Sequence, residues 1–118
     1  MLDLFETGEF DGVILSNVLD VMPENVASDL LERLARITKK DGYWFVKLNP
    51  YYAQEELASF GYHQLQPHLY DDQGVLRLRQ ESTEYWEKIL GRYGIIQDYV
   101  EFAYPWQKGM NRLMLLKR

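Results

Sequence analysis

The chain has 118 residues, of which 47% are hydrophobic and 14% aromatic, enough to fill the core of one modest domain. Its formal net charge of -5 argues against sequence-independent binding to nucleic acid, and the absence of cysteine excludes disulfides and thiolate metal sites. The sequence shows neither a signal-peptide pattern nor an apolar run that could span a membrane, so we expect a cytoplasmic protein. No repeat or linker divides it, and residues 1–118 are expected to form a single domain.

The first predicted element is a strand within Phe10–Leu19. The run Val13–Leu15 has no polar alternation, which is typical of a parallel strand that is covered on both faces. The strand ends in the polar pair Ser16 and Asn17. Ligands bind at the carboxyl ends of parallel strands, so this pair lies where a binding crevice is expected.

A helix and a second strand are predicted next. Pro23 is expected at the first helical position. Apolar side chains then recur at helical spacing, namely Val26, Leu30, Leu34 and Ile37, with Ala27 and Leu31 widening the stripe. Lys39 and Lys40 are expected to close the helix, because cations suit its C-terminal dipole. Gly42 is expected to provide a left-handed stop before the strand Tyr43–Leu48, which completes a strand, helix, parallel strand unit.

The middle of the chain, about residues 62–93, is predicted to be an addition to the sheet. It follows a short helix from about Ala53 to Phe60 that Gly61 stops. Two strands are predicted on either side of the turn Asp71–Gly74. Their alternating apolar residues are Leu65, Pro67 and Leu69 on the first strand, and Leu76 and Leu78 on the second. Arg77 and Arg79 alternate with the second set, so both are expected to point outward.

A further helix and a terminal hairpin complete the predicted elements. Ser82–Glu84 is expected to cap the helix, and Gly94 to end it. Its apolar face is made of Trp86, Ile89, Leu90 and Tyr93. The β-rich runs Ile95–Tyr104 and Met110–Lys117 are joined by only five residues, which favours an antiparallel hairpin.

In this order and spacing the motifs resemble the C-terminal half of a class I S-adenosylmethionine (SAM)-dependent methyltransferase. Phe10-Asp11 before the first strand, Ser16–Leu19 at its end and Lys39–Gly42 before the second strand stand at the positions of the family's motifs. A last strand that inserts antiparallel into the sheet separates this family from hydride-transferring Rossmann enzymes. The resemblance implies an α/β fold: a partial Rossmann-like sheet of the family's fourth to seventh strands, with an antiparallel C-terminal hairpin and an inserted β-hairpin plus helix.

The same resemblance implies methyl transfer from SAM, with Ser16, Asn17 and Val18 contacting the donor. The family holds its donor mainly through a Gly-rich turn after its first strand and an acidic residue ending its second. No Gly-x-Gly turn occurs in this sequence, and the family's first three strands are expected to be missing. We therefore expect weak or no SAM binding by the chain alone. It would be the acceptor-side portion of an enzyme; the alternative is a non-catalytic remnant acting as a binding or dimerisation module.

Residues for the unknown methyl acceptor are predicted after the second strand. Asn49-Pro50-Tyr51-Tyr52 is similar to the Asn-Pro-Pro-Tyr motif by which amino-methyltransferases grip a flipped adenine. That motif follows the family's fourth strand, whereas Asn49 follows the fifth, so nucleic acid is not the expected acceptor. Asn49, Tyr51 and Tyr52 are instead predicted to line a site for a small molecule.

Two further sets of side chains are candidates for the acceptor site. Arg77 and Arg79 suit an anionic acceptor, although outward charges on a hairpin are as a rule solvated. Trp106 belongs to an aromatic cluster whose other members are Tyr99, Phe102 and Tyr104. Such a cluster can stack on a planar ligand, and it can equally serve to pack the hairpin against helices.

The remaining titratable candidates are Asp20 and the two histidines, and each also has a purely structural interpretation. Asp20 is suited to be a general base, but acidic residues before helices are more often caps. The positions of His63 and His68 differ by an odd number on a predicted strand, so the two side chains are expected on opposite faces. We therefore predict no metal site.

The first predicted strand also bears on assembly. Without its family neighbour, the segment Gly12–Ser16 would be an exposed edge with no proline or lysine to protect it. We expect a partner to cover it, either a second copy in a homodimer or a donor-binding half.

Overall fold

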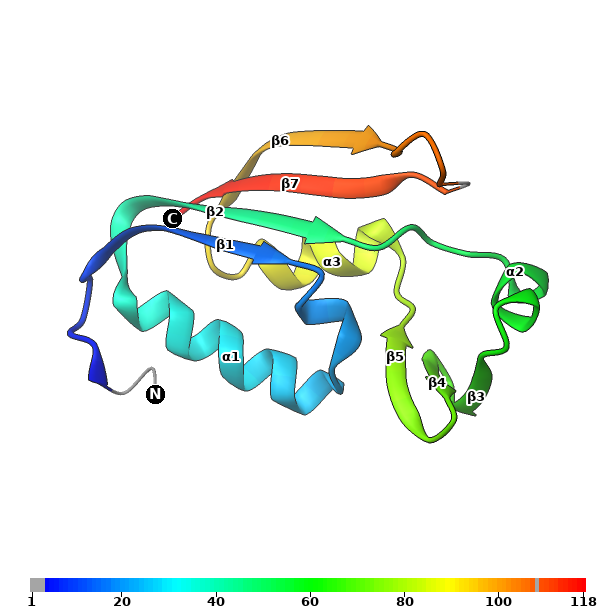
Figure 1. The fold of residues 1–118 in the computed structure, drawn as a ribbon. Helices are drawn as coiled ribbons and strands as arrows, with labels where there is room; N and C mark the ends of the chain where they lie inside the picture. The colour runs from blue at the N-terminus through cyan, green and yellow to red at the C-terminus, as the bar shows by residue number, and fades with distance from the viewer. Residues whose placement is uncertain (1–3, 108) are drawn as a thin grey trace.

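The computed structural model describes residues 4–107 and 109–118. Its larger sheet has four strands in the order β1-β2-β7-β6. These are β1 (Phe10–Ser16), β2 (Thr38–Leu48), β6 (Ile95–Phe102) and β7 (Asn111–Lys117). β1 and β2 are parallel, whereas β7 runs antiparallel to both β2 and β6 (Figure 1). The predicted parallel pair and the inserted antiparallel last strand are both confirmed.

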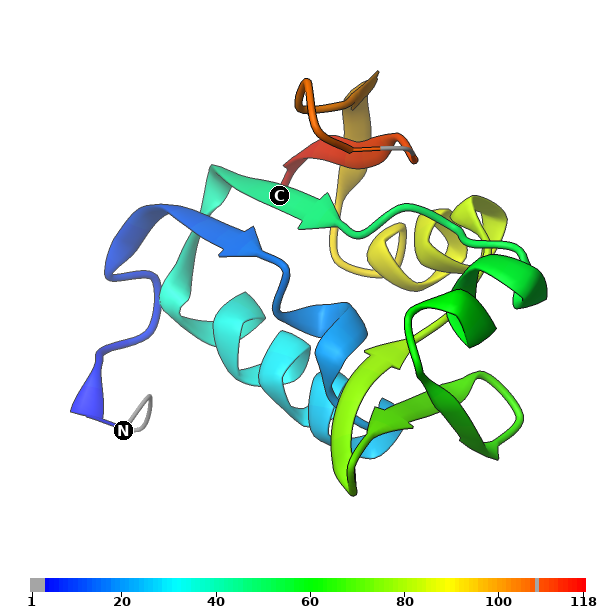
Figure 2. The ribbon, with the colours of Figure 1, turned by 45° about the vertical axis from the view of Figure 1, so that its right-hand side comes forward.

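The core lies between this sheet and two helices. α1 (Glu24–Ile37) and α3 (Thr83–Leu90) lie on the same side of the sheet (Figures 1 and 2). The fully buried side chains between these layers include Leu31, Trp44, Trp86, Leu90, Met114 and Leu116. Among the described residues, no helix is long and apolar enough to cross a membrane.

The opposite side of the sheet is open within the described part of the chain, which corrects one prediction. Leu15 is 6% exposed, but Ile14 on the other face of β1 is 76% exposed. Phe45 and Val100 on the same open face are 42% and 46% exposed. The expectation that β1 is covered on both faces was wrong for this chain, because an apolar run shows only that both faces suit burial.

Helix α1 forms where expected, but its register and end differ from the prediction. Pro23 is the N-cap residue, one position before the helix. The buried side chains are Ala27, Leu31, Leu34 and Ile37, whereas Val26 is 46% exposed. A broad apolar stripe does not reveal which of its flanks faces the sheet, and here the flank with Ala27 does.

The passage from α1 into β2 is immediate. Thr38 starts the strand and bridges the two elements, since its Oγ1 donates to the Leu34 carbonyl at 2.7 Å and accepts from Trp44 Nε1 at 2.9 Å. Lys39 and Lys40 therefore lie in β2 and do not close the helix. Asp41, not Gly42, is left-handed, with φ 70°. A Cβ at Gly42 would lie 2.6 Å from the Asp11 carbonyl, so glycine is needed there for close approach.

The middle of the chain forms a second sheet with the order β3-β4-β5. Its strands are β3 (His63–Gln66), β4 (Leu69–Asp72) and β5 (Val75–Arg79), and α2 (Gln54–Ser59) precedes them. The hairpin around residues 71–74 is confirmed, with left-handed φ values of 53° at Gln73 and 83° at Gly74. The first predicted strand was wrong, because a turn at Pro67-His68 divides it in two. His63 and His68 thus do not share a strand.

Helix α3 is capped as predicted but ends earlier. The Ser82 hydroxyl accepts the Tyr85 N–H at 3.1 Å. The helix ends at Leu90, four residues before Gly94. A Cβ at Gly94 would collide with the Lys117 carbonyl, so this glycine serves the entry into β6 and not the helix stop.

Candidate functional site

The parallel strands β1 and β2 both end facing the second sheet (Figure 1). Asn17 follows β1 with a left-handed φ of 55°, which asparagine tolerates better than most residues. Its N–H donates to the Lys47 carbonyl at 3.0 Å, and its buried Oδ1 has no partner among the described residues. Ser16 is exposed, and Val18 is half-buried at the start of the short 3-10 helix η2 (Leu19–Val21). The predicted donor residues thus lie together at this strand end.

Asp20 is fully buried within η2 and contacts the end of β2. Its Oδ2 accepts the Asn49 N–H at 2.6 Å, while Oδ1 has no partner among the described residues. Burial raises the pKa of Asp20, and the hydrogen bond from Asn49 partly offsets that rise. The cap interpretation was wrong, because Val18 caps η2 and Pro23 caps α1. Asp20 instead holds the chain where β2 ends.

Arg112 completes this arrangement from β7. It is 4% exposed, and its Nε and Nη2 donate to the Asn49 carbonyl at 3.2 and 2.9 Å. Its Nη1 donates to the Glu81 carbonyl and to Thr83 Oγ1. Desolvation lowers the pKa of Arg112, and the nearby Asp20 acts in the opposite direction. Asn49 is therefore clamped on its N–H by a buried acid and on its carbonyl by a buried cation.

Sequence reasoning missed this clamp. The signal that points to it is the cation Arg112, which stands directly before the apolar run Leu113–Leu116 in a strand that is expected to be buried. A charge in a buried strand needs partners, and here they come from the segment after β2 and from the start of α3.

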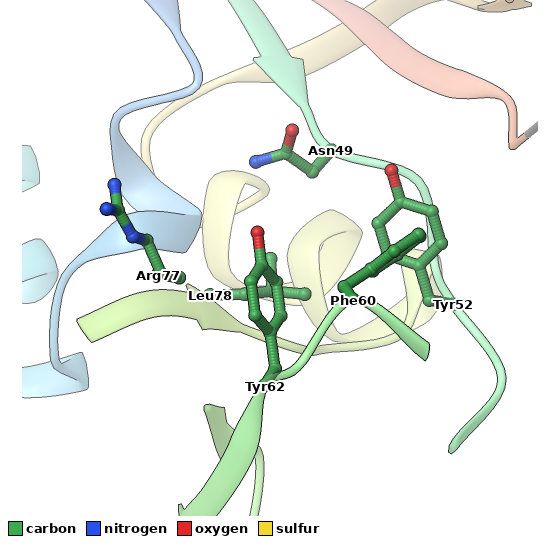
Figure 3. A pocket seen from close by; sticks show the side chains of 6 residues that line it. All are labelled: Asn49, Tyr52, Phe60, Tyr62, Arg77 and Leu78. Atoms are coloured by element: carbon green, nitrogen blue, oxygen red, sulfur yellow. The ribbon is translucent and has the colours of Figure 1, made fainter. Parts of the chain in front are cut away.

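A cavity of about 110 Å³ opens beside the clamp (Figure 3). It is lined by Asn49, Tyr52, Phe60, Tyr62, Arg77 and Leu78. The structure thus brings together three of the predicted acceptor residues, Asn49, Tyr52 and Arg77. Phe60 meets Tyr52 edge to face at 5.2 Å between ring centroids, and Tyr62 at 5.7 Å. Phe60 and Tyr62 were not predicted to line a site. The feature of the sequence that could have indicated them is Gly61 between them, whose φ of 81° turns the chain there.

A second cavity of about 290 Å³ shares Tyr52 and Phe60 with the first and adds Trp106 and Gln107. Trp106 is 80% exposed and stacks on Tyr104, with 5.1 Å between centroids and an interplanar angle of 6°. The predicted residue Trp106 therefore lies next to the Asn49 cavity. Of the predicted aromatic cluster, Tyr104 stacks on it, and Phe102 meets Tyr104 edge to face.

Tyr51 and Arg79 lie apart from these two cavities. Tyr51 is 59% exposed and lines a different hollow, with His68, Tyr70 and Gln80 among its other residues. Arg79 is 4% exposed, donates to the Met22 carbonyl at 3.1 Å and lies 4.8 Å over the Trp86 ring.

The outward orientation expected of Arg79 was wrong. It shares a face of β5 with the exposed Arg77, but η2 and α3 cover that end of the strand. Within the described residues, no group of three acidic or histidine side chains is placed to hold a metal ion.

No protein-family model and no curated protein sequence matches the chain. Solved structures do match. The 1,6-didemethyltoxoflavin-N1-methyltransferase of Burkholderia thailandensis, crystallised with its namesake compound and S-adenosylhomocysteine, is 14% identical with a TM-score of 0.76. The match covers 99% of this chain and 47% of that one.

Two further structures agree. A SAM-dependent methyltransferase from Methanosarcina mazei is 10% identical with a TM-score of 0.73, covering 97% of this chain and 61% of that one. The magnesium protoporphyrin IX methyltransferase of Synechocystis, with bound S-adenosylhomocysteine, is 25% identical with a TM-score of 0.63, covering 94% and 46%. The chain spans about half the length of the first of these structures. Its fold is a partial Rossmann-like sheet of the SAM-dependent methyltransferase kind.

Proposed function

We propose that this chain is the acceptor-side, C-terminal portion of a SAM-dependent methyltransferase. The observation that carries the proposal is the coincidence of the methyltransferase strand order with a side-chain-lined cavity at the carboxyl end of β2. Ligands bind at this edge in open α/β sheets. The two neighbours crystallised with S-adenosylhomocysteine support SAM as the donor.

The residues at the end of β1 fit one part of that donor. The buried, unpartnered Oδ1 of Asn17 is an acceptor that suits the ammonium of the methionine moiety, and the exposed Ser16 and the backbone of Val18 lie beside it. When bound, SAM supplies an electrophilic methyl group. The described residues contain no Gly-rich turn to approach the rest of the donor, so the fit is partial.

The contribution of this chain's own residues is positioning. Asn49 is fixed from both sides by Asp20 and Arg112, so its side chain has a fixed base at the cavity wall. The rings of Tyr52 and Phe60 line the same cavity and offer an apolar surface on which an acceptor can rest. Holding an acceptor in a fixed orientation toward the donor accounts for much of the rate in a direct transfer.

The rest of the donor site is proposed to come from a second polypeptide segment. It would dock on the free edge of β1 at Gly12–Ser16 and across the open sheet face, where Ile14, Phe45 and Val100 are exposed. The chain matches only about half the length of its neighbours, which is consistent with a partner of similar size. A homodimer through the same edge, with the chain acting as a dimerisation module, is the second candidate, and the exposed β-branched edge is the observation that favours it.

The donor contact is tested in the complex of this chain with the proposed second segment, as translated from the DNA immediately upstream. Asn17→Gly removes the amide and keeps the left-handed backbone. We expect it to weaken S-adenosylhomocysteine binding about tenfold by calorimetry. Asn25→Gly, on the exposed side of α1, is the control. Equal affinity of the Asn17→Gly and unmodified complexes would remove Asn17 from the donor site.

A further inference from the structure

The two cavities that share Tyr52 and Phe60 also bear on the chemical class of the acceptor. We propose that they take a planar aromatic molecule carrying a carboxylate. The proposal rests on the proposed function, because it concerns the molecule that would receive the methyl group.

The rings favour a flat, apolar ligand body. Three aromatic side chains, Tyr52, Phe60 and Tyr62, line the smaller cavity, and Trp106 adds a fourth ring in the cavity that shares Tyr52 and Phe60 with it. Phe60 is 45% exposed and Trp106 80% exposed, so much of their apolar surface is open to water. A flat conjugated ring covers such surface by offset or edge-to-face contact, which a saturated ring of the same size does less well.

The charge favours an anion. Arg77 is the one charged residue that lines the smaller cavity, and the chain around it is acidic overall. Within the described residues, the Arg77 guanidinium and the Tyr62 hydroxyl make no hydrogen bond or ion pair, unlike Arg79 two positions on. Figure 3 shows both groups beside the same space as the Asn49 amide. A carboxylate accepts two parallel N–H hydrogen bonds from a guanidinium and an O–H hydrogen bond from a hydroxyl.

The site is also largely preformed. The Gln80 side chain accepts the Tyr52 N–H at 2.8 Å and donates to the Tyr52 carbonyl at 2.7 Å, as a neighbouring strand would. The backbone at Gly109 approaches so closely that an added Cβ would lie 2.6 Å from the Pro50 Cβ. Asn49 is held by its buried clamp. Because these side chains are already held in place, a ligand loses little binding free energy to ordering them.

The test is an NMR titration of the 15N-labelled 118-residue chain with 2-naphthoate, without SAM. We expect saturable shifts of the amides of Asn49, Tyr52, Phe60 and Tyr62. The neutral isostere 2-naphthamide and the non-planar cyclohexanecarboxylate are expected to bind at least fivefold more weakly. Raising the salt concentration should weaken 2-naphthoate selectively, because Arg77 is exposed.

Two variants separate the charge from the rings. Arg77→Gln should weaken 2-naphthoate about five- to tenfold and leave 2-naphthamide unchanged. Arg92→Gln, an exposed arginine that lines neither cavity, is the matched control and should bind as the unmodified chain does. Phe60→Ala should weaken all aromatic probes, and its surface position leaves the fold intact.

Three results would overturn the proposal: equal binding of 2-naphthoate and 2-naphthamide, no effect of Arg77→Gln, or shifts confined to the open sheet face around Ile14 and Phe45. Because the titration contains no donor, its failure rejects the acceptor class and leaves the donor contact to its own test. Binding of 2-naphthoate together with a complex that cannot bind S-adenosylhomocysteine would keep the anion site and reject methyl transfer.

Discussion

At the scale of single residues, the buried acid Asp20 sets a pH dependence. Burial raises its folded-state pKa above 3.8, so its contribution to stability is fully present below that pH and is lost as pH rises through the folded pKa. Asp20→Asn keeps an oxygen for the Asn49 N–H but does not titrate. We expect the unmodified chain to lose stability relative to Asp20→Asn as pH rises from below 3.8 toward neutrality. Urea unfolding of both proteins across this range measures it, and a difference independent of pH would contradict the burial argument.

The arginines of β5 make a matched pair for stability. Arg79 is buried, and its removal would leave the Met22 carbonyl and the Tyr85 hydroxyl without their donor. Arg79→Ala should lower the free energy of unfolding by about 2–4 kcal/mol. Arg77→Ala, two residues away and exposed, should change it by less than about 0.5 kcal/mol. If urea unfolding showed similar losses of unfolding free energy for the two variants, Arg79 would not be more deeply buried than Arg77 in solution.

Residue-level reasoning from the sequence placed several predicted residues near one another but could not tell a buried side chain from an exposed one. Asn49, Tyr52 and Arg77 were predicted for the acceptor side, and the fold brings them to one cavity, while their role in binding stays a prediction. Arg79 could not be separated from Arg77, since both alternate with leucines and only the covering by η2 and α3 distinguishes them.

At the scale of elements, the glycines at the sheet margins are required by close contact. An alanine Cβ at Gly94 would collide with the Lys117 carbonyl and push β6 from β7. Gly94→Ala should therefore cost about 2 kcal/mol or more of unfolding free energy. Gly12→Ala is the milder comparison, with its Cβ at 3.3 Å from the Tyr43 carbonyl. If the Gly94→Ala protein had the same free energy of unfolding as the unmodified chain, β6 and β7 would be able to move apart here without cost.

The elements themselves were predicted largely correctly, because their periodicities are distinct. The errors lie at ends and turns. Helix α1 passes directly into β2 at Thr38, so Lys39 and Lys40 do not mark the end of the helix. The turn at Pro67-His68 divides a segment in which apolar and polar residues alternate without a break in the sequence. Such boundaries depend on tertiary contacts, which local pattern does not contain.

At the scale of the whole molecule, we expect the open sheet side and its free edge to govern assembly. Ile14 is exposed on the edge strand β1, and we expect the chain alone to self-associate at tens of micromolar in light scattering. Ile14→Lys should return it to a monomer, because a charge there opposes edge pairing. Val26→Lys, on the exposed flank of α1, should not. A monodisperse unmodified monomer, or equal effects of the two lysines, would exclude the β1 edge as the contact.

The central claim is that this chain provides the acceptor side of a methyltransferase and needs a second segment to hold the donor. Calorimetric titration with S-adenosylhomocysteine tests it most directly, on the purified chain and on the same chain produced together with the segment translated from the DNA immediately upstream. We predict weak or no binding by the chain alone and micromolar or tighter binding by the complex. Micromolar binding by the chain alone would contradict the need for a second segment, and a stable complex that does not bind S-adenosylhomocysteine would contradict the proposed function itself.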